Sequence, residues 1–361
     1  MTINRNLYDI ASIIHAIIFG ALGGGICYAL GIPAPWLAGS LVATIIAIYT
    51  NQKLDLPEIL RTAAFILLGV QTGTAVNSDT LARAAQWPLS ILCLAITVIL
   101  IVWACTIYYT KFRNWDRPTA LFASLPGALS LVILLASSSE ADMRRVTIAQ
   151  CVRLFFLIAA LPAVIKYISP LRVSGNAVAT MGSISEIVIL VVVSAAAGLL
   201  FARLKVPAGL ILGASLVSAA LGLTGIVHGA APNSILIPAN IILGVMIGLR
   251  FKGISFTELR AAFGDGFAGF VLAMVIAVVG AIITSNVADL PIALTLLAFA
   301  PGGLEAMTIM AFALNLDPAY VAAHQVARYI GMVLFMPAIT AYVLNRGVSV
   351  GKTLGVGVEQ D

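Results

Sequence analysis

The hydrophobic positions of this chain gather in stretches long enough to cross a bilayer, which takes about 20 helical residues. The first half contains such stretches at residues 10–30, 35–50, 59–76, 87–109, 118–137 and 147–168. The second half contains them near residues 184–202, 207–224, 234–250, 264–285, 290–314 and 319–344. No polar connection between them is long enough to fold as a separate domain. The pattern predicts an all-α polytopic membrane protein in contact with the lipid bilayer.

Composition supports this prediction. Hydrophobic residues make up 61% of the 361 positions and charged residues 10%, whereas soluble domains carry about 25% charge. The net charge of +5 comes from Lys and Arg scattered over short loops, so it indicates membrane topology and no nucleic-acid partner. The stretch from Leu7 to Leu30 lacks a cleavage site of small residues, so we expect it to be an uncleaved first helix.

The chain repeats itself with a constant offset. Pro33 and Gly39 recur 174 residues later as Pro207 and Gly213. All further matches are 175 residues apart: Leu68-Gly69-Val70 and Gly73 with Leu243-Gly244-Val245 and Gly248, Pro126-Gly127 with Pro301-Gly302, Gln150 and Arg153 with Gln325 and Arg328, and Pro162 with Pro337. This regularity indicates an internal duplication. It predicts one membrane repeat over residues 1–168, a linker over 169–183 and a second repeat over 184–361.

Positive charges in the loops indicate how the two copies are oriented. If all twelve stretches crossed the membrane with the amino terminus inside, ten Lys and Arg residues would be cytoplasmic and eight external, almost without the usual inside bias. If the Pro-Gly segment of each copy enters and leaves on the same side, the division becomes fifteen to three. The bias predicts inverted repeats, each with five transmembrane helices and one re-entrant segment, and cytoplasmic termini. It leaves open which segment is re-entrant.

The two Pro-Gly sequences, at Pro126-Gly127 and at Pro301-Gly302-Gly303, predict breaks inside apolar segments. Proline removes a backbone donor and glycine tolerates positive φ, so a continuous helix is disfavoured there. Broken backbone at membrane depth must be buried in protein or line a water-filled cavity. Helix ends freed in this way form substrate sites in transporters, although a proline kink that only supports packing is the alternative.

Two polar pairs lie in the apolar segments that follow the breaks. Gln150 and Arg153, and likewise Gln325 and Arg328, are three residues apart and therefore share one helix face. An intramembrane arginine faces a partner or a cavity, and its planar fork can bind two oxygens of a carboxylate or phosphate. Two interpretations remain open: the arginines bind an anionic substrate, or they cap carbonyls freed by the breaks.

Other polar residues of these segments differ between the copies. Glu305 corresponds to Ser130, and His324 corresponds to Ala149. Both Glu305 and His324 are therefore candidates for coupling transport to H⁺ or Na⁺. Alternatively, Glu305 neutralises a nearby arginine and His324 makes a structural hydrogen bond. The secondary candidates for lining a cavity are Gln71, Thr72 and Asn240. Asp142 and Asp317 are predicted to cap helix starts. Packing roles are predicted for Cys27, Cys93, Cys105 and Cys151.

The chain also resembles a known family. The resemblance lies in Gly31-Ile32-Pro33-Ala34-Pro35-Trp36-Leu37 with Gly39, in Leu68-Gly69-Val70 with Gly73, and above all in Pro301-Gly302-Gly303-Leu304-Glu305-Ala306-Met307. These sequences are similar to those of the AbrB family of membrane proteins, also called the AbrB duplication family, some members of which are labelled ammonia monooxygenase. The similarity covers essentially the whole chain. The first copy reads Pro126-Gly127-Ala128-Leu129-Ser130 and lacks the glutamate, so a role for that residue transfers only to Glu305.

The labels carried by this family can be tested against residues. A copper or iron monooxygenase needs clustered ligands, but His15, His228 and His324 are dispersed and form no ligand pair, so we expect no enzyme, metal or cofactor. A regulatory role, which the resemblance also implies, cannot be direct DNA binding because the chain has no soluble helix-turn-helix or basic arm. Such an effect on gene expression would be indirect, through a transported signal or a partner.

The sequence therefore predicts a secondary transporter of the cell inner membrane for a small organic anion, with a membrane regulatory protein or sensor as the alternative. The predicted substrate-binding residues are Pro126, Gly127, Gln150, Arg153, Pro301, Gly302, Gly303, Gln325 and Arg328, and the predicted coupling residues are Glu305 and His324. Self-association, substrate identity and coupling ion stay open at this point.

Overall fold

The computed structural model describes residues 10–76, 87–126, 132, 139–168, 183–204, 206, 208–227, 232–314, 316–332 and 334–335. Every regular element in these ranges is a helix. In the first copy the helices are α1 (Ile10–Ala29), α2 (Pro35–Tyr49), α3 (Glu58–Thr74), α5 (Trp87–Ile107) with the π-helical turn η1 (Tyr108–Phe112), α6 (Arg117–Ser124) and α8 (Met143–Ile168). In the second copy they are α9 (Ile184–Arg203), α10 (Gly209–Leu223), α11 (Asn233–Gly248) with the 3₁₀ turn η2 (Leu249–Phe251), α12 (Phe256–Val287), α13 (Ile292–Phe299), α14 (Leu304–Ala313) and a helix over residues 318–332.

Six described helices are long and apolar enough to cross a membrane: α1, α5 extended by η1, α8, α9, α11 extended by η2, and α12. Helices α2 and α10 are shorter but equally apolar. Helix α12 begins at Phe256, before the apolar stretch predicted from residue 264, because Ser255 and Glu258 form a capping box that starts the helix early. The chain is therefore an all-helical, multi-pass membrane protein.

Residue size is distributed in the opposite way to that of a soluble core. The buried positions of α1 are Ser12, Ala16, Gly20, Gly23 and Gly24, and those of α12 are also small, mostly Gly and Ala. Many exposed positions of both helices are large and apolar, among them Ile10, Ile14 and Leu22 in α1 and Val275 and Val279 in α12. Small residues let helices approach closely, and large apolar residues outside suit lipid contact.

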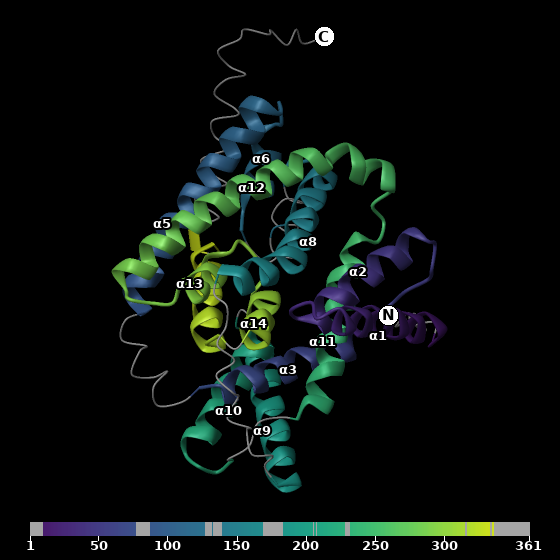
Figure 1. The fold of residues 1–361 in the computed structure, drawn as a ribbon, viewed down its shortest axis with the longest axis vertical. Coiled ribbons are helices and arrows are strands. Elements are labelled where there is room, and N and C mark those ends of the chain that lie inside the picture. Colours follow the sequence, from purple (N-terminus) through teal and green to yellow (C-terminus); the bar gives the residue numbers. More distant parts are fainter. Residues whose placement is uncertain are drawn as a thin grey trace, which may run out of the picture.

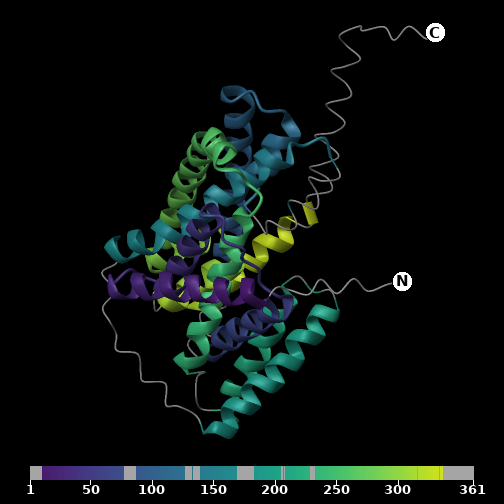
Figure 2. The same cartoon turned by 90° about the vertical axis from the view of Figure 1, so that its right-hand side faces the viewer.

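Helices of the two copies are interleaved in two bundles (Figures 1 and 2). One bundle contains α1, α2 and α3 with α9, α10 and α11; α9 and α10 lie at its lower end in both views. The other contains α5, α6 and α8 with α12 and α13, and here α5 and α12 run side by side. A central hydrophobic core that includes Leu68, Leu157 and Phe299 joins the bundles.

The two copies exchange equivalent contacts. Helix α2 packs on α11, and its counterpart α10 packs on α3, the counterpart of α11. The glycines at these crossings match as well: a Cβ on Gly69 would stand 2.6 Å from the Ile211 carbonyl oxygen, and a Cβ on Gly244 would stand 2.6 Å from the Leu37 carbonyl oxygen. The duplication seen in the sequence is thus a duplication of packing.

Backbone conformation repeats at the same offsets. The residues before α2 and α10, Ala34 and Ala208, have φ of 50° and 54°, and Asn114 and Asp289, shortly before α6 and α13, have φ of 54° and 49°. Non-glycine residues adopt this left-handed region only where the surrounding structure requires it. Four such residues at matched positions show that the two copies preserve their turns as well as their helices.

The crossing glycines generate a stability prediction. We expect Gly69→Ala and Gly244→Ala each to lower the free energy of unfolding by about 1–3 kcal/mol, because an added methyl group meets backbone that cannot move aside. The matched control is Gly264→Ala in α12, where no atom lies within 4 Å of the added Cβ. Thermal unfolding of the purified variants in detergent measures this; equal unfolding temperatures for all three would contradict the crossing geometry.

Candidate functional site

The predicted break in the second copy is present. Helix α13 ends at Phe299 and α14 begins at Leu304, with a non-helical bend over residues 300–303 between them. The Gly302 amide donates a hydrogen bond to the Ala300 carbonyl oxygen, with 2.8 Å between nitrogen and oxygen. A Cβ added at Gly302 would collide with the Met307 side chain. The short half-helices and the intervening turn are buried, so the freed polar groups need protein partners.

The first copy has the same arrangement as far as the structure describes it. Helix α6 begins after Asp116, whose carboxylate accepts a hydrogen bond from the Thr119 amide, and it ends at Ser124. Leu125 is extended and Pro126 is buried. Gly127 lies outside the described residues. The end of α6 therefore falls at the position equivalent to the end of α13.

Each Gln–Arg pair caps the carbonyl end of its own half-helix. Arg153 donates through Nη1 to the Leu125 carbonyl at 3.0 Å, and Arg328 donates through Nη1 to the Ala300 carbonyl at 2.8 Å. Leu125 and Ala300 are equivalent residues of the two copies. In α8, and in the helix over 318–332, the preceding glutamine accepts from the same guanidinium through its side-chain oxygen.

The glutamine amides complete the caps. Gln150 Nε2 donates to the carbonyls of Phe122 at 2.9 Å and Leu125 at 3.1 Å, and Gln325 Nε2 donates to the Ala298 carbonyl at 3.1 Å. Unsatisfied carbonyls at a buried helix end are costly, and these side chains replace the missing backbone donors. The sequence predicted that Gln and Arg share a helix face, and it left open whether the arginines cap freed carbonyls or bind an anion. The structure shows the capping hydrogen bonds directly.

The capped carbonyls are neutral groups, so these hydrogen bonds do not neutralise the positive charge of the arginines. The side chains are 5% exposed at Arg153 and 6% at Arg328, and no acidic side chain in the described part of the chain forms an ion pair with either. The two guanidinium groups are close enough to interact with one another electrostatically. Arg153 Nε is buried without a hydrogen-bond partner among the described residues. Among the described residues, therefore, neither buried guanidinium has a carboxylate partner.

The start of α14 adds a second feature attractive to an anion. Arg328 also donates to the carbonyl of Gly302. The next residue, Gly303, is the N-cap of α14, and no described side chain caps this helix start. Free amides at a helix N-terminus carry partial positive charge. The backbone of Glu305 lies in this first turn, and its side chain is outside the described part.

His324 is buried in a separate cluster on the same helix as Arg328. Its Nδ1 donates to the Tyr320 carbonyl at 2.8 Å, because a carbonyl can only accept, and its Nε2 lies 2.8 Å from Ser90 Oγ of α5. The rings of Tyr320 and His324 are 3.9 Å apart. The sequence reasoning missed Ser90 and Tyr320; a polar residue at Ser90 inside the apolar stretch 87–109 was the available signal.

The secondary candidates have local roles in the structure. Asp142 accepts from the amides of Arg144 and Arg145, and Asp317 accepts from Ala319 and Tyr320, so both predicted helix caps are confirmed. Thr72 is buried and donates to the Leu68 carbonyl at 2.8 Å. Within the described residues, Cys27, Cys93, Cys105 and Cys151 are free thiols and form no disulfide.

Comparison with known proteins now places the chain. The family model described as "Transition state regulatory protein AbrB" matches residues 36–344, which is most of the chain and includes both breaks and both Gln–Arg pairs. The chain belongs to the AbrB family. Among its relatives is the Escherichia coli (strain K12) protein named "Putative regulator AbrB", which is 26% identical over 327 residues, covering 87% of this chain and 91% of the relative.

A second relative comes from another bacterium. The Bacillus subtilis (strain 168) protein named "Uncharacterized protein YhjN" is 26% identical over 352 residues, covering 89% of this chain and 90% of the relative. Both similarities extend over nearly the full length of each chain. The resemblance noted from the sequence motifs is confirmed, and the names of the relatives give no substrate.

The capping geometry generates a stability prediction. We expect Arg328→Gln to reduce the free energy of unfolding by on the order of 3 kcal/mol, because buried carbonyls at Ala300 and Gly302 lose their donor and each unsatisfied group costs about 1–3 kcal/mol. The control is Arg260→Gln, which removes an exposed arginine of α12. Thermal unfolding in detergent compares the two; a loss no larger than that of the control would show that the cap is not needed.

Proposed function

We propose that this AbrB-family protein is a secondary transporter of the cell inner membrane that carries a small organic anion. The observation that supports it most is the pair of buried guanidinium groups of Arg153 and Arg328, each held at the end of a broken half-helix and without a carboxylate partner among the described residues. A buried charge is expensive unless a partner neutralises it. An anion bound between them supplies that partner during each transport cycle.

The substrate site in this proposal lies between the two breaks. Arg153 offers its unpartnered Nε, and the start of α14 offers amide groups next to Gly302 and Gly303. Carboxylate oxygens suit both, since a guanidinium fork and a helix N-terminus each favour a bidentate anion. Glu305, in the same turn of α14, would carry the coupling proton or cation, and His324 would be its second candidate.

Inverted repeats are part of the proposal. The exchange of α2 and α10 between the copies is expected of two units related by a twofold axis, and the loop charges favour an axis in the membrane plane. In that orientation α6 enters the membrane from the cytoplasmic side and α13 from the outside. The five crossings and one re-entrant segment per copy, and the cytoplasmic termini, follow from the same argument.

A regulatory membrane protein is the second candidate, favoured by the words "regulatory" and "regulator" in the names of the family and of the relative. Such a protein would influence gene expression indirectly, with the anion as its signal and no transport. A transport-deficient variant distinguishes the two: if Arg153→Gln abolishes uptake but restores normal expression to a deletion strain, regulation is independent of transport.

A binding screen tests the transporter proposal. We expect one class among mono- and dicarboxylates, phosphate and sulfate to raise the unfolding temperature of the purified protein, because a ligand that binds only the folded state adds about 2.7 kcal/mol at a hundredfold excess over its dissociation constant. The effect should disappear in Arg153→Gln and persist in the control Arg260→Gln. Uptake of the same anion into proteoliposomes should then depend on an ion gradient in the wild type and lose that dependence in Glu305→Gln.

Two results would contradict the proposal. One is the absence of stabilisation by every anion while Arg153→Gln lowers only the stability of the ligand-free protein, which would leave the arginines as structural caps. The other is binding without uptake under any gradient, which would favour the sensor.

A further inference from the structure

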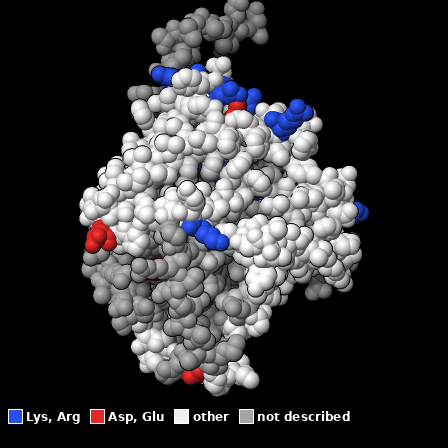
Figure 3. Space-filling model, viewed as in Figure 1, with Lys and Arg blue, Asp and Glu red and all other residues white. Residues whose placement is uncertain are grey.

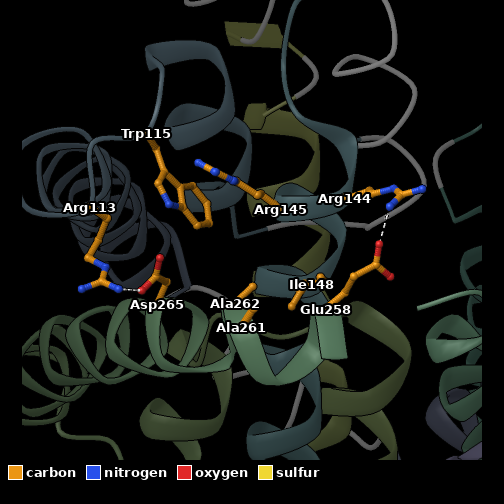
Figure 4. Close-up of a pocket in the computed structure, with 9 residues that line it drawn as sticks. All are labelled: Arg113, Trp115, Arg144, Arg145, Ile148, Glu258, Ala261, Ala262 and Asp265. Carbon is orange, nitrogen blue, oxygen red and sulfur yellow. Dashed lines mark hydrogen bonds and ion pairs between the residues drawn. The ribbon is translucent and has the colours of Figure 1, made fainter. Parts of the chain in front are cut away.

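A cavity of about 300 Å³ opens at one end of α5 (Figure 4). It lies between the first turns of α12, the start of α8 and the loop before α6, and Ala262, Arg145 and Trp115 form part of its wall. On the face of the molecule drawn in Figure 3, Lys and Arg gather near the uppermost end, and much of the described surface below carries no charge. The cavity is therefore at a polar end of an otherwise apolar protein.

The charges around this cavity are already paired. Arg113 forms an ion pair with Asp265 and Arg144 with Glu258, and the bond to Asp265 raises the pKa of Arg113. Arg145 forms an ion pair with Asp142, with 3.4 Å between Nε and Oδ2, and its Cζ lies over the Trp115 ring at 5.6 Å from the ring centroid. Both signs of charge lie around the cavity and pair with one another, so its lining is polar but is not that of a tight anion site.

Aromatic residues connect the cavity to the buried arginine of the first copy. Trp115 stacks on Tyr109 with ring centroids 4.5 Å apart, and Tyr109 belongs to the same buried cluster as Ala123 and Ala149. The Tyr109 side chain is close enough to Arg153 for the two to interact electrostatically. Both side chains are buried, so this stacked aromatic pair separates the floor of the cavity from Arg153.

At the equivalent position of the other copy, the described residues pack against one another. At an offset of 175 residues, Ala262 corresponds to Trp87, Asp265 to Ser90, and Arg145 to Tyr320. Trp87 packs edge-on against Tyr320 with centroids 6.1 Å apart, and Ser90, Tyr320 and His324 are fully or almost fully buried. An indole occupies the place where the first site has the methyl group of Ala262.

The cavity and this aromatic cluster lie far apart. Trp87 and Ser90 begin α5, whereas Tyr109 follows its last residue, and a helix of this length measures about 30 Å, the thickness of the hydrocarbon core. Arg145 is eight residues before Arg153, as Tyr320 is before Arg328. The cavity and the aromatic cluster therefore lie at equivalent distances from the two arginines along their helices, and the cluster is filled where the first copy has a cavity.

We propose that the cavity is the open outer mouth of a route to Arg153, with the Trp115–Tyr109 stack as its inner barrier, and that Trp87, Ser90, Tyr320 and His324 form the filled mouth of the counterpart route on the opposite face. The inference rests on the proposed function, because it assigns the two faces of the same site. Exchange between the states requires the Trp87–Tyr320 contact to open while the cavity beside Ala262 closes. The residues that set access are thus those at which the duplicated copies differ in size.

Cysteine accessibility tests the two routes without any substrate. Ala262→Cys and Ser90→Cys are introduced singly, and vesicles of each orientation are treated with a charged, membrane-impermeant methanethiosulfonate. Peptide mass spectrometry locates the label, so the native Cys27, Cys93, Cys105 and Cys151 remain as internal references. We expect Ala262→Cys to be labelled from one face only and Ser90→Cys from neither.

Exchanging the equivalent residues provides the second measurement. Trp87→Ala in the Ser90→Cys protein should make that cysteine reactive from the face opposite to the one that labels Ala262→Cys. Ala262→Trp should fill the cavity and abolish labelling of Ile148→Cys, a position on its wall. Both swapped residues already occur at the equivalent position of the other copy. Gly264→Ala, introduced into the Ser90→Cys protein, controls for a substitution outside either route.

The outcomes separate this inference from the proposed function. Labelling of Ser90→Cys in the otherwise wild-type protein, labelling of Ala262→Cys from both faces, or exposure of both cysteines on the same face would overturn the assignment of routes. The expected labelling pattern together with no anion binding would support the routes and remove the anion transporter. Anion uptake that persists in Ala262→Trp would also contradict the cavity as the entrance.

Discussion

The interior of this protein depends on a constraint of backbone hydrogen bonding in the absence of water. A helix broken inside a membrane leaves carbonyl groups that lipid cannot satisfy, and each copy meets this need with one glutamine and one arginine from the following long helix. Arg153 and Arg328 hold the ends of α6 and α13 at equivalent carbonyls. The breaks persist because these caps exist, and the buried positive charge is a consequence of the caps.

That charge connects the architecture to the proposed function. A neutral donor could satisfy the carbonyls, but a guanidinium does so with hydrogen-bonding capacity to spare, as the unpartnered Nε of Arg153 shows. An anion that reached the arginines would find them already positioned and desolvated. The family name refers to regulation, and a protein that changes the level of a small anion on one side of a membrane could produce such an effect without touching DNA.

Duplication supplied the framework, and divergence at single positions made the two copies unequal. Reciprocal packing of α2 on α11 and α10 on α3 holds both copies in one structure. Within it, Ala262 leaves a cavity where its counterpart Trp87 fills the space, and Ala149 is replaced by His324. An open cavity and a filled counterpart therefore coexist in a single conformation.

The sequence by itself determined the class of fold, the duplication, the break at Pro301-Gly302, the caps at Asp142 and Asp317, and the shared face of each Gln–Arg pair. These depend on interactions within a few residues or on matching positions along the chain, so local geometry decides them. Whether the arginines cap carbonyls, which helices of one copy pack on the other, and where a cavity forms were decided only by the tertiary structure. Such contacts join segments far apart in the chain, as Ser90 meets His324, and in a chain that is apolar almost throughout, hydrophobic pattern alone does not specify which surfaces meet.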